Sequence, residues 1–137
     1  MKRAPMRSRY RDTGPGAETV AVVVERDRGL CAVCGHEVSG TRGLDWSVQH
    51  RLARKGGGTQ RRWVNFPSNL VLLCGHGTTG CHFRVESQGA WARDQGYKIR
   101  EGRWRPPEVG IEHAAHGRRV YLTDDGGISD TPPEVAA

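Results

Sequence analysis

The sequence predicts a small α+β domain that has an N-terminal helix and is held together by a zinc knuckle. Three observations lead to this fold class. The chain has 137 residues, including 19 glycines and 7 prolines, so we expect one small domain with many loops and a limited apolar core. Four cysteines occur as two widely separated pairs. Two short strand patterns flank a long loop and are followed by a helical pattern.

The part before the first cysteine pair divides into a basic arm and a helix. Residues 1–16 carry five basic side chains and one acid, which is typical of a disordered arm that either contacts phosphates or is a solvated tail. From Glu18 to Arg28 an apolar face is followed by charges, which predicts a short helix ending at Gly29. We assign residues 17–125 to the folded domain and 126–137 to a disordered tail.

The central part of the chain predicts two strands and a helix. Asp45 to His50 alternates apolar and polar residues, and Leu70 to Cys74 is a continuous apolar run typical of a buried strand. From Cys81 to Gln95 the apolar residues have helical spacing, and Gly96 is a natural end for that helix. Arg119 to Thr123 predicts one further short strand.

The charge of the chain favours a polyanionic partner such as nucleic acid. Lys and Arg number 21 against 15 Asp and Glu, a formal net charge of +6. The loop between the two central strands, residues 51–68, holds no acidic side chain, so it is the expected site of phosphate contacts. Its candidate nucleic-acid-binding residues are Arg51, Arg54, Lys55, Arg61 and Arg62.

The sequence predicts no membrane partner and a cytoplasmic location. The longest apolar run, Val20 to Val24, has five residues, far fewer than the roughly 18 of a membrane span. The basic N-terminus is not followed by the apolar segment of a secretory signal. In a reducing cytoplasm, paired cysteines are better explained as metal ligands than as disulfides.

The cysteines predict a structural zinc site. The first pair forms a CAVCG knuckle, and the second pair, in CGHGTTGC, is a knuckle widened to six intervening residues. The four candidate ligands are Cys31, Cys34, Cys74 and Cys81. His76 or His82 could replace one cysteine, and the alternative to a metal site is four reduced, buried thiols.

These motifs occur in the order found in HNH endonucleases of phages and actinobacteria. CAVCG is followed by QHRLARKGGGT, then by PSNLVLLC and GTTGCH, so that residues 31–96 resemble the family. The resemblance implies a ββα-metal finger, in which two antiparallel strands and a long loop precede a helix that closes over one divalent cation. It also implies hydrolysis of DNA phosphodiester bonds, one strand at a time.

The resemblance assigns roles to single residues. His50 matches the general base, Asn69 the residue that orients it, and His82 a ligand of the catalytic metal. The residue before the base is commonly a metal-binding Asp or His, whereas here it is Gln49, a weaker ligand. Glu86 follows His82 by four residues and could share the cation from the same helix face, or be a solvated acid. The expected catalytic cation is Mg²⁺, Mn²⁺, Ni²⁺ or Zn²⁺.

We therefore expect a metal-dependent DNA endonuclease of a bacterial host or phage-infected cell. The resemblance adds phage terminase and packaging proteins as expected partners beside DNA. The alternative is a non-catalytic zinc-knuckle DNA-binding module that lost its catalytic metal through Gln49. The combination of His50, Asn69 and His82 with a glycine-rich loop favours the enzyme, because a binding module needs none of these. His36, His113 and His116 are expected to be ordinary surface residues.

Overall fold

The computed structural model describes residues 13–54, 61–102 and 104–134. Within these ranges the chain forms α-helices, short 3₁₀ helices and two small antiparallel sheets, which confirms the predicted α+β class. The elements are α1 Ala17–Arg26, β1 Trp46–His50, η1 Arg62–Asn65, η2 Pro67–Asn69, β2 Leu70–Cys74, α2 Gly80–Ser87, α3 Gly89–Gln95, η3 Pro106–Glu108, β3 Ile111–His113, β4 Arg118–Leu122 and β5 Ile128–Ser129. No helix in the described part of the chain is both long enough and apolar enough to span a membrane.

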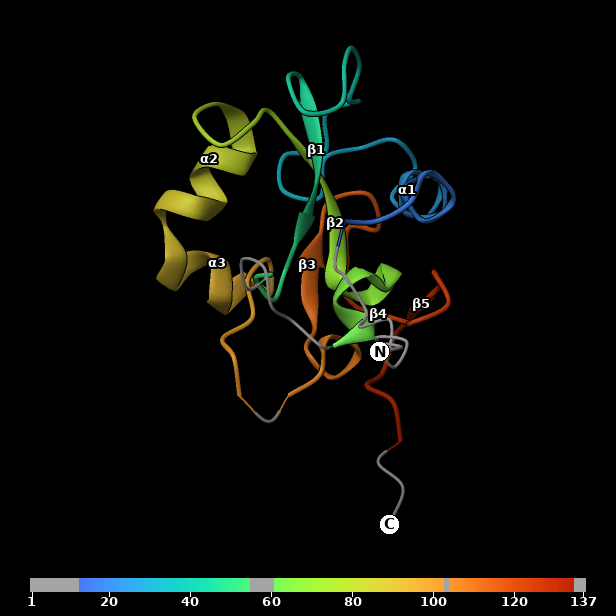
Figure 1. Cartoon of the computed structure of the whole chain (residues 1–137). Helices are drawn as coiled ribbons and strands as arrows, with labels where there is room; N and C mark the ends of the chain where they lie inside the picture. Colours follow the sequence, from blue (N-terminus) through green and yellow to red (C-terminus); the bar gives the residue numbers. More distant parts are fainter. Residues whose placement is uncertain (1–12, 55–60, 103, 135–137) are drawn as a thin grey trace, which may run out of the picture.

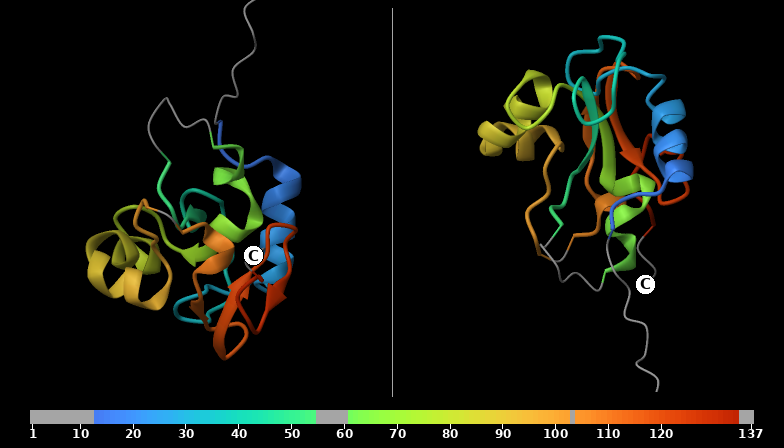
Figure 2. Two further views of the ribbon diagram at one scale, coloured as in Figure 1. Left: turned by 90° about the horizontal axis from the view of Figure 1, so that it is seen from below. Right: turned by 45° about the horizontal axis from the view of Figure 1, so that its top comes forward.

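The antiparallel pair of β1 and β2 lies at the centre of the molecule (Figure 1). Trp46 pairs with Cys74 at one end of the two strands and His50 with Leu70 at the other. The first four residues of β2 are fully buried, as expected for an apolar run that is covered on both faces. Helices α2 and α1 both contact β2 and lie on opposite sides of the strand pair (Figure 2).

The segment predicted as one helix from Cys81 to Gln95 consists of two helices, α2 and α3. Gln88 leaves the helical conformation, with φ −115° and ψ 63°, and is followed by Gly89, a poor helix former. After this break Ala92 is buried in the core. Gly96 ends α3 with φ 89°, and a Cβ there would lie 2.0 Å from the Gly110 carbonyl oxygen, so only glycine fits this close approach.

The second sheet is formed by β3, β4 and β5 and corrects the predicted C-terminal boundary. The strand expected at residues 119–123 is present as β4. The tail predicted for residues 126–137, however, begins with β5, which pairs with β4 and places Ser129 opposite Tyr121. A tight turn makes this possible, because Thr123 N–H donates to the Gly127 carbonyl at 3.0 Å. The basic arm up to residue 12 and residues 135–137 lie outside the described residues.

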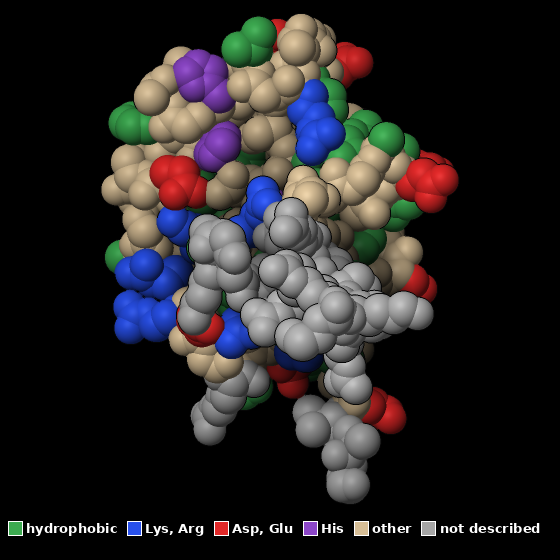
Figure 3. All heavy atoms as spheres, viewed as in Figure 1, with side chains coloured by type: hydrophobic (Ala, Val, Ile, Leu, Met, Phe, Trp, Pro, Cys, Tyr) green, Lys and Arg blue, Asp and Glu red, His purple; other side chains and the backbone are tan. Residues whose placement is uncertain are grey.

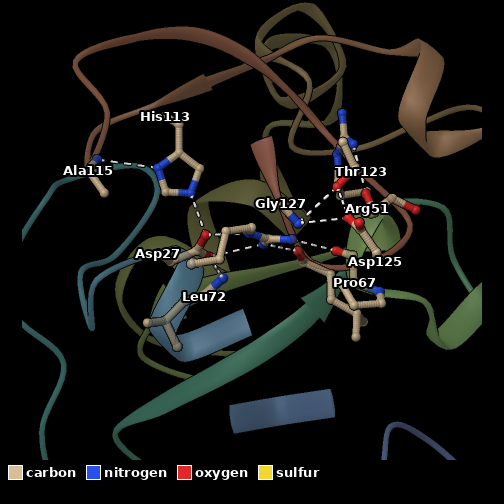
Figure 4. Close-up of polar contacts among 12 residues, drawn as sticks. Asp27, Arg51, Pro67, Leu72, His113, Ala115, Thr123, Asp125 and Gly127 are labelled. Atoms are coloured by element: carbon tan, nitrogen blue, oxygen red, sulfur yellow. Dashed lines mark hydrogen bonds and ion pairs between the residues drawn. The ribbon is translucent and has the colours of Figure 1, made fainter. Parts of the chain in front are cut away.

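A buried polar network joins α1 to both sheets (Figure 4). Asp27, at the end of α1, accepts hydrogen bonds from Arg26 Nε at 2.8 Å and from Leu72 N–H at 3.0 Å. His113 Nε2, from β3, lies 2.9 Å from Asp27 Oδ1. The prediction that His113 is a surface residue is wrong, since only 2% of it is exposed. Burial alone would raise the pKa of Asp27, but its contacts with His113 and Arg26 lower it below the usual value.

Candidate functional site

The four cysteines come together from separate parts of the chain. Cys31 and Cys34 follow α1, Cys74 ends β2, and Cys81 lies in the first turn of α2. Their four sulfur atoms lie within 4.8 Å of one another, and Cys34 Sγ is 3.8 Å from Cys74 Sγ. Zinc–sulfur bonds of about 2.3 Å place neighbouring sulfurs of a tetrahedron about 3.8 Å apart. None of the four is disulfide-bonded, so the cluster could bind a structural metal such as zinc.

Backbone turns bring the second cysteine pair together despite its wide spacing. Gly75 has φ 84°, and a Cβ at this position would lie 2.1 Å from the Thr79 carbonyl oxygen. This close approach folds the intervening residues back, so that Cys81 N–H reaches Cys74 Sγ at 3.4 Å. His76 and His82 are not members of the sulfur group. All four candidate ligands of the structural metal are therefore cysteines.

The protonation of these thiols couples metal binding to pH. Burial raises the pKa of Cys31 to about 11, and burial together with the neighbouring thiols raises the pKa of Cys81. Burial opposes ionisation of Cys74 as well, but hydrogen bonds from Cys81 lower its pKa below the usual value. Metal ions bind the thiolate form of cysteine. A cation bound here must therefore displace protons, and its affinity falls as the pH falls.

His50 is the last residue of β1, and its ring is held by an asparagine that sequence reasoning missed. His50 Nε2 lies 2.7 Å from Asn65 Oδ1. Because an amide oxygen only accepts hydrogen bonds, Nε2 carries the ring proton and Nδ1 is the basic nitrogen. Asn65 closes η1 in the loop after β1. The only available signal was the polar residue in an otherwise apolar stretch, WVNF.

Asn69 does not have the predicted role as the direct partner of His50. It is fully buried, and its Oδ1 accepts a hydrogen bond from Leu52 N–H at 2.7 Å. Its Nδ2 donates to the carbonyls of Leu52, at 3.0 Å, and Val64, at 2.9 Å. Asn69 therefore connects the two ends of the loop that follows His50 and holds the backbone of that loop in place.

His82 and Glu86 project from α2 toward β1. His82 Nδ1 lies 2.9 Å from Ser47 Oγ, and Gln49 Nε2 donates a hydrogen bond to Glu86 Oε1. Ser47 and Gln49 are two residues apart on a strand and so face the same side, while His82 and Glu86 are one helical turn apart. The four side chains therefore meet between β1 and α2. Burial lowers the pKa of His82, although the charge of Glu86 opposes this.

The negative charge of Glu86 in this cluster is already paired with a lysine. Lys98 Nζ lies 3.1 Å from Glu86 Oε2, so Gln49 and Lys98 together occupy both oxygens of that carboxylate. Among the described residues, the ligand atoms of His50, His82 and Glu86 do not all lie within 4.8 Å of one another, so these three side chains do not form a compact metal-ligand group. In the view of Figure 3, the surface over α2 and β1 carries histidine side chains close to acidic and basic side chains.

A second group of ligand-type atoms belongs to the buried network. Asp27, His113 and His116 each offer an atom within 4.8 Å of the others. His113 Nδ1, however, accepts a hydrogen bond from Ala115 N–H at 3.3 Å, so the ring proton is on Nε2, where a metal would have to bind. Asp27 is already paired with Arg26. The group is therefore explained as structural.

The residues predicted to bind phosphate fall into different environments. Arg51 is fully buried, which corrects its assignment as a phosphate contact. Its guanidinium donates to four backbone carbonyls, those of Gly96, Ser68, Pro106 and Val109, and burial lowers its pKa. Arg54 and Arg62 are exposed, Arg61 is half-buried, and Lys55 lies outside the described residues.

Comparison of the chain with protein-family models, with curated proteins and with solved structures finds no match. The functional assignment therefore depends on the geometry of the site itself.

Proposed function

We propose that this protein is a metal-dependent DNA endonuclease of the HNH type, in which β1, β2 and α2 are the ββα-metal finger. The observation that carries the proposal is a pair of oriented imidazoles on these elements. His50 is held at Nε2 by Asn65 and His82 at Nδ1 by Ser47. Each ring thus has one nitrogen held by a neutral side chain, which orients the ring, and at His50 the amide oxygen also defines the tautomer needed for a base.

His50 is the general base of the proposed reaction. Its Nδ1 takes the proton of a water molecule whose oxygen attacks the phosphorus, and the bond from phosphorus to the leaving 3′ oxygen breaks. The imidazolium that forms keeps its Nε2–H donated to Asn65 Oδ1, so the ring does not turn during proton transfer. Histidine is the side chain that most often acts as a general base in enzymes.

A divalent cation would stabilise the charge that develops on the phosphate and on the leaving oxygen. His82 and Glu86 would hold it, since both side chains face the same region between α2 and β1. Hard cations such as Mg²⁺ often bind one or two protein ligands and complete their coordination with water and substrate phosphate. The contact of Glu86 with Lys98 is partly exposed to solvent, and surface pairs of this kind are worth only about 0–1 kcal/mol, so the carboxylate can exchange partners.

The rest of the molecule supports the site. A zinc ion bound by the four cysteines would join the end of α1 to β2 and α2, and so fix the strand pair against its helix. The net charge of +6 favours DNA, and the exposed Arg54 and Arg62 lie on the loop that follows His50. Association with phage packaging proteins stays a prediction from the sequence resemblance alone.

One observation favours the alternative, a zinc-knuckle DNA-binding module without catalysis. Both oxygens of Glu86 are already occupied, by Gln49 and by Lys98. A module that had lost its catalytic cation would be expected to fill the position with such neutral and cationic side chains.

Incubation with supercoiled plasmid separates the two functions. The full-length protein is supplied with Mg²⁺, Mn²⁺, Ni²⁺ or Zn²⁺ in parallel, with an EDTA arm for each, and DNA binding is measured by gel shift in the same buffers. The endonuclease produces nicked circles with at least one cation and none with EDTA. Binding without nicking under all four cations contradicts the endonuclease and supports the module.

A further inference from the structure

A group of tryptophan and arginine side chains lies outside the hydrophobic core. The guanidinium carbons of Arg61 and of Arg105 each lie 5.4 Å from the ring centroid of Trp63, within the range of cation–π contacts. Trp104, next to Arg105 in the chain, is 51% exposed. We call Arg61, Trp63, Trp104 and Arg105 the arginine–tryptophan surface.

This surface is close to the imidazole of His50. Trp63 and Asn65 belong to the same 3₁₀ helix, η1, and Asn65 Oδ1 contacts His50 Nε2 at 2.7 Å. A 3₁₀ helix rises about 2.0 Å per residue, so Trp63 and Asn65 are separated by about 4 Å along its axis. Trp63 is therefore a near neighbour in the chain of the residue that holds the His50 ring, which places this side of the surface beside a phosphate at His50.

The chemistry of the surface suits exposed bases better than a closed duplex. Aromatic rings stack on the faces of bases, which are accessible in a single strand and covered by neighbouring pairs in a duplex. Arginine side chains add charge for the backbone phosphates and cation–π contacts. Arg61 pairs with Glu101 and Arg105 with Asp124, all with partly exposed side chains. Because exposed ion pairs are weak, phosphates can replace these two acids.

We propose that the arginine–tryptophan surface binds unpaired bases of a DNA strand next to the scissile phosphate at His50. The substrate class is then DNA with single-stranded character, such as a flap or gap, and not continuous duplex. Charge complementarity supports this occupant, because the protein carries a net charge of +6. The inference depends on the proposed function for the position of the scissile phosphate.

Binding to matched DNA probes tests the surface without cleavage. The His50→Ala protein is titrated into fluorescein-labelled oligonucleotides of one sequence as a single strand, a blunt duplex and a duplex with a flap, at one salt concentration. We expect the single strand and the flap to bind more tightly than the blunt duplex. Adding Trp104→Ala should weaken single-strand binding by roughly 5- to 100-fold, the typical loss for one stacked base, and leave duplex binding nearly unchanged.

Two further variants keep the test independent of folding. Leu44, near the far end of β1 from His50, is another large exposed apolar side chain, 66% exposed, and Leu44→Ala should leave both affinities unchanged. Trp104→Phe keeps an aromatic ring and should retain most of the single-strand preference. Equal affinities for single strand and duplex, or an unchanged preference in Trp104→Ala, overturn the inference.

The outcomes also separate this inference from the proposed function. Metal-dependent nicking by the wild-type protein together with no single-strand preference overturns the arginine–tryptophan surface alone. If the protein nicks DNA with none of the four cations but shows a single-strand preference that depends on Trp104, the result supports the surface and contradicts the endonuclease.

Discussion

Replacing Cys34 with serine isolates the contribution of the metal to folding. Cys34 is exposed, so the substitution removes a thiolate ligand but little buried apolar surface. Its Sγ lies 3.8 Å from Cys74 Sγ, the separation expected for two sulfurs on one zinc. Any large loss of stability in Cys34→Ser therefore reports on the metal and not on packing.

The expected magnitude is a large share of the total stability. Structural zinc contributes roughly 10–16 kcal/mol in small peptides, whereas a whole domain is stable by only about 5–15 kcal/mol. Loss of even a third of the zinc contribution would cost roughly 3–5 kcal/mol and lower the melting temperature by roughly 10–20 °C. EDTA treatment of the wild-type protein should produce a similar loss, and acidification should release zinc because the buried thiols bind protons tightly, with a pKa of about 11 for Cys31.

The assay combines metal analysis with thermal unfolding. Zinc per chain is measured by elemental mass spectrometry and unfolding by circular dichroism, for the wild type, Cys34→Ser and His36→Ala. His36 Nδ1 lies 3.2 Å from Cys34 Sγ but is not a member of the ligand group, so His36→Ala should retain its zinc. A Cys34→Ser protein with one zinc per chain and wild-type melting would refute the reasoning.

Further predictions concern the polar residues of the framework. Asn69→Ala leaves three backbone groups without a partner and should cost roughly 2–5 kcal/mol of unfolding free energy in urea, while an unchanged midpoint would contradict the loop-tying role. Arg51→Ala leaves four backbone carbonyls without their donor and should cost about 3–5 kcal/mol or more. Arg54→Ala should leave stability unchanged and reduce the salt dependence of DNA binding by about one phosphate contact. The reverse pattern would restore Arg51 as the DNA contact. The folded-state pKa of Asp27 is lowered, so its stabilising effect is present above its unfolded pKa of about 3.9 and is lost as the pH falls through the folded pKa. Asp27→Asn should therefore flatten the decline of stability in acid, measured as melting temperature against pH.

Local patterns predicted the elements that carry the site. The apolar run of β2 and the αL glycine at the end of α3 are local properties, and both were read correctly from the sequence. The cysteines were also predicted as one cluster, because thiolate spacing is constrained by the metal they would share. The break at Gln88 was missed, since helical spacing of apolar residues continues on both sides of it.

Contacts between distant segments were beyond reach of the sequence. Arg51 lies among basic loop residues in the chain, yet it is buried because carbonyls from Gly96, Pro106 and Val109 converge on its guanidinium. Composition cannot distinguish such an arginine from an exposed one. Likewise, the motif order pointed to Asn69 as the partner of His50, but the loop path brings Asn65 to the ring instead.

The most direct test of the central claim is the single-turnover rate of DNA cleavage by His50→Ala. His50 is assigned proton transfer and no metal ligand, so the variant should lose 10²- to 10⁴-fold in rate while retaining its zinc, its melting temperature and its DNA affinity. A cleavage rate equal to that of the wild type, with the same cation and the same DNA affinity, would contradict the assignment of His50 as the general base.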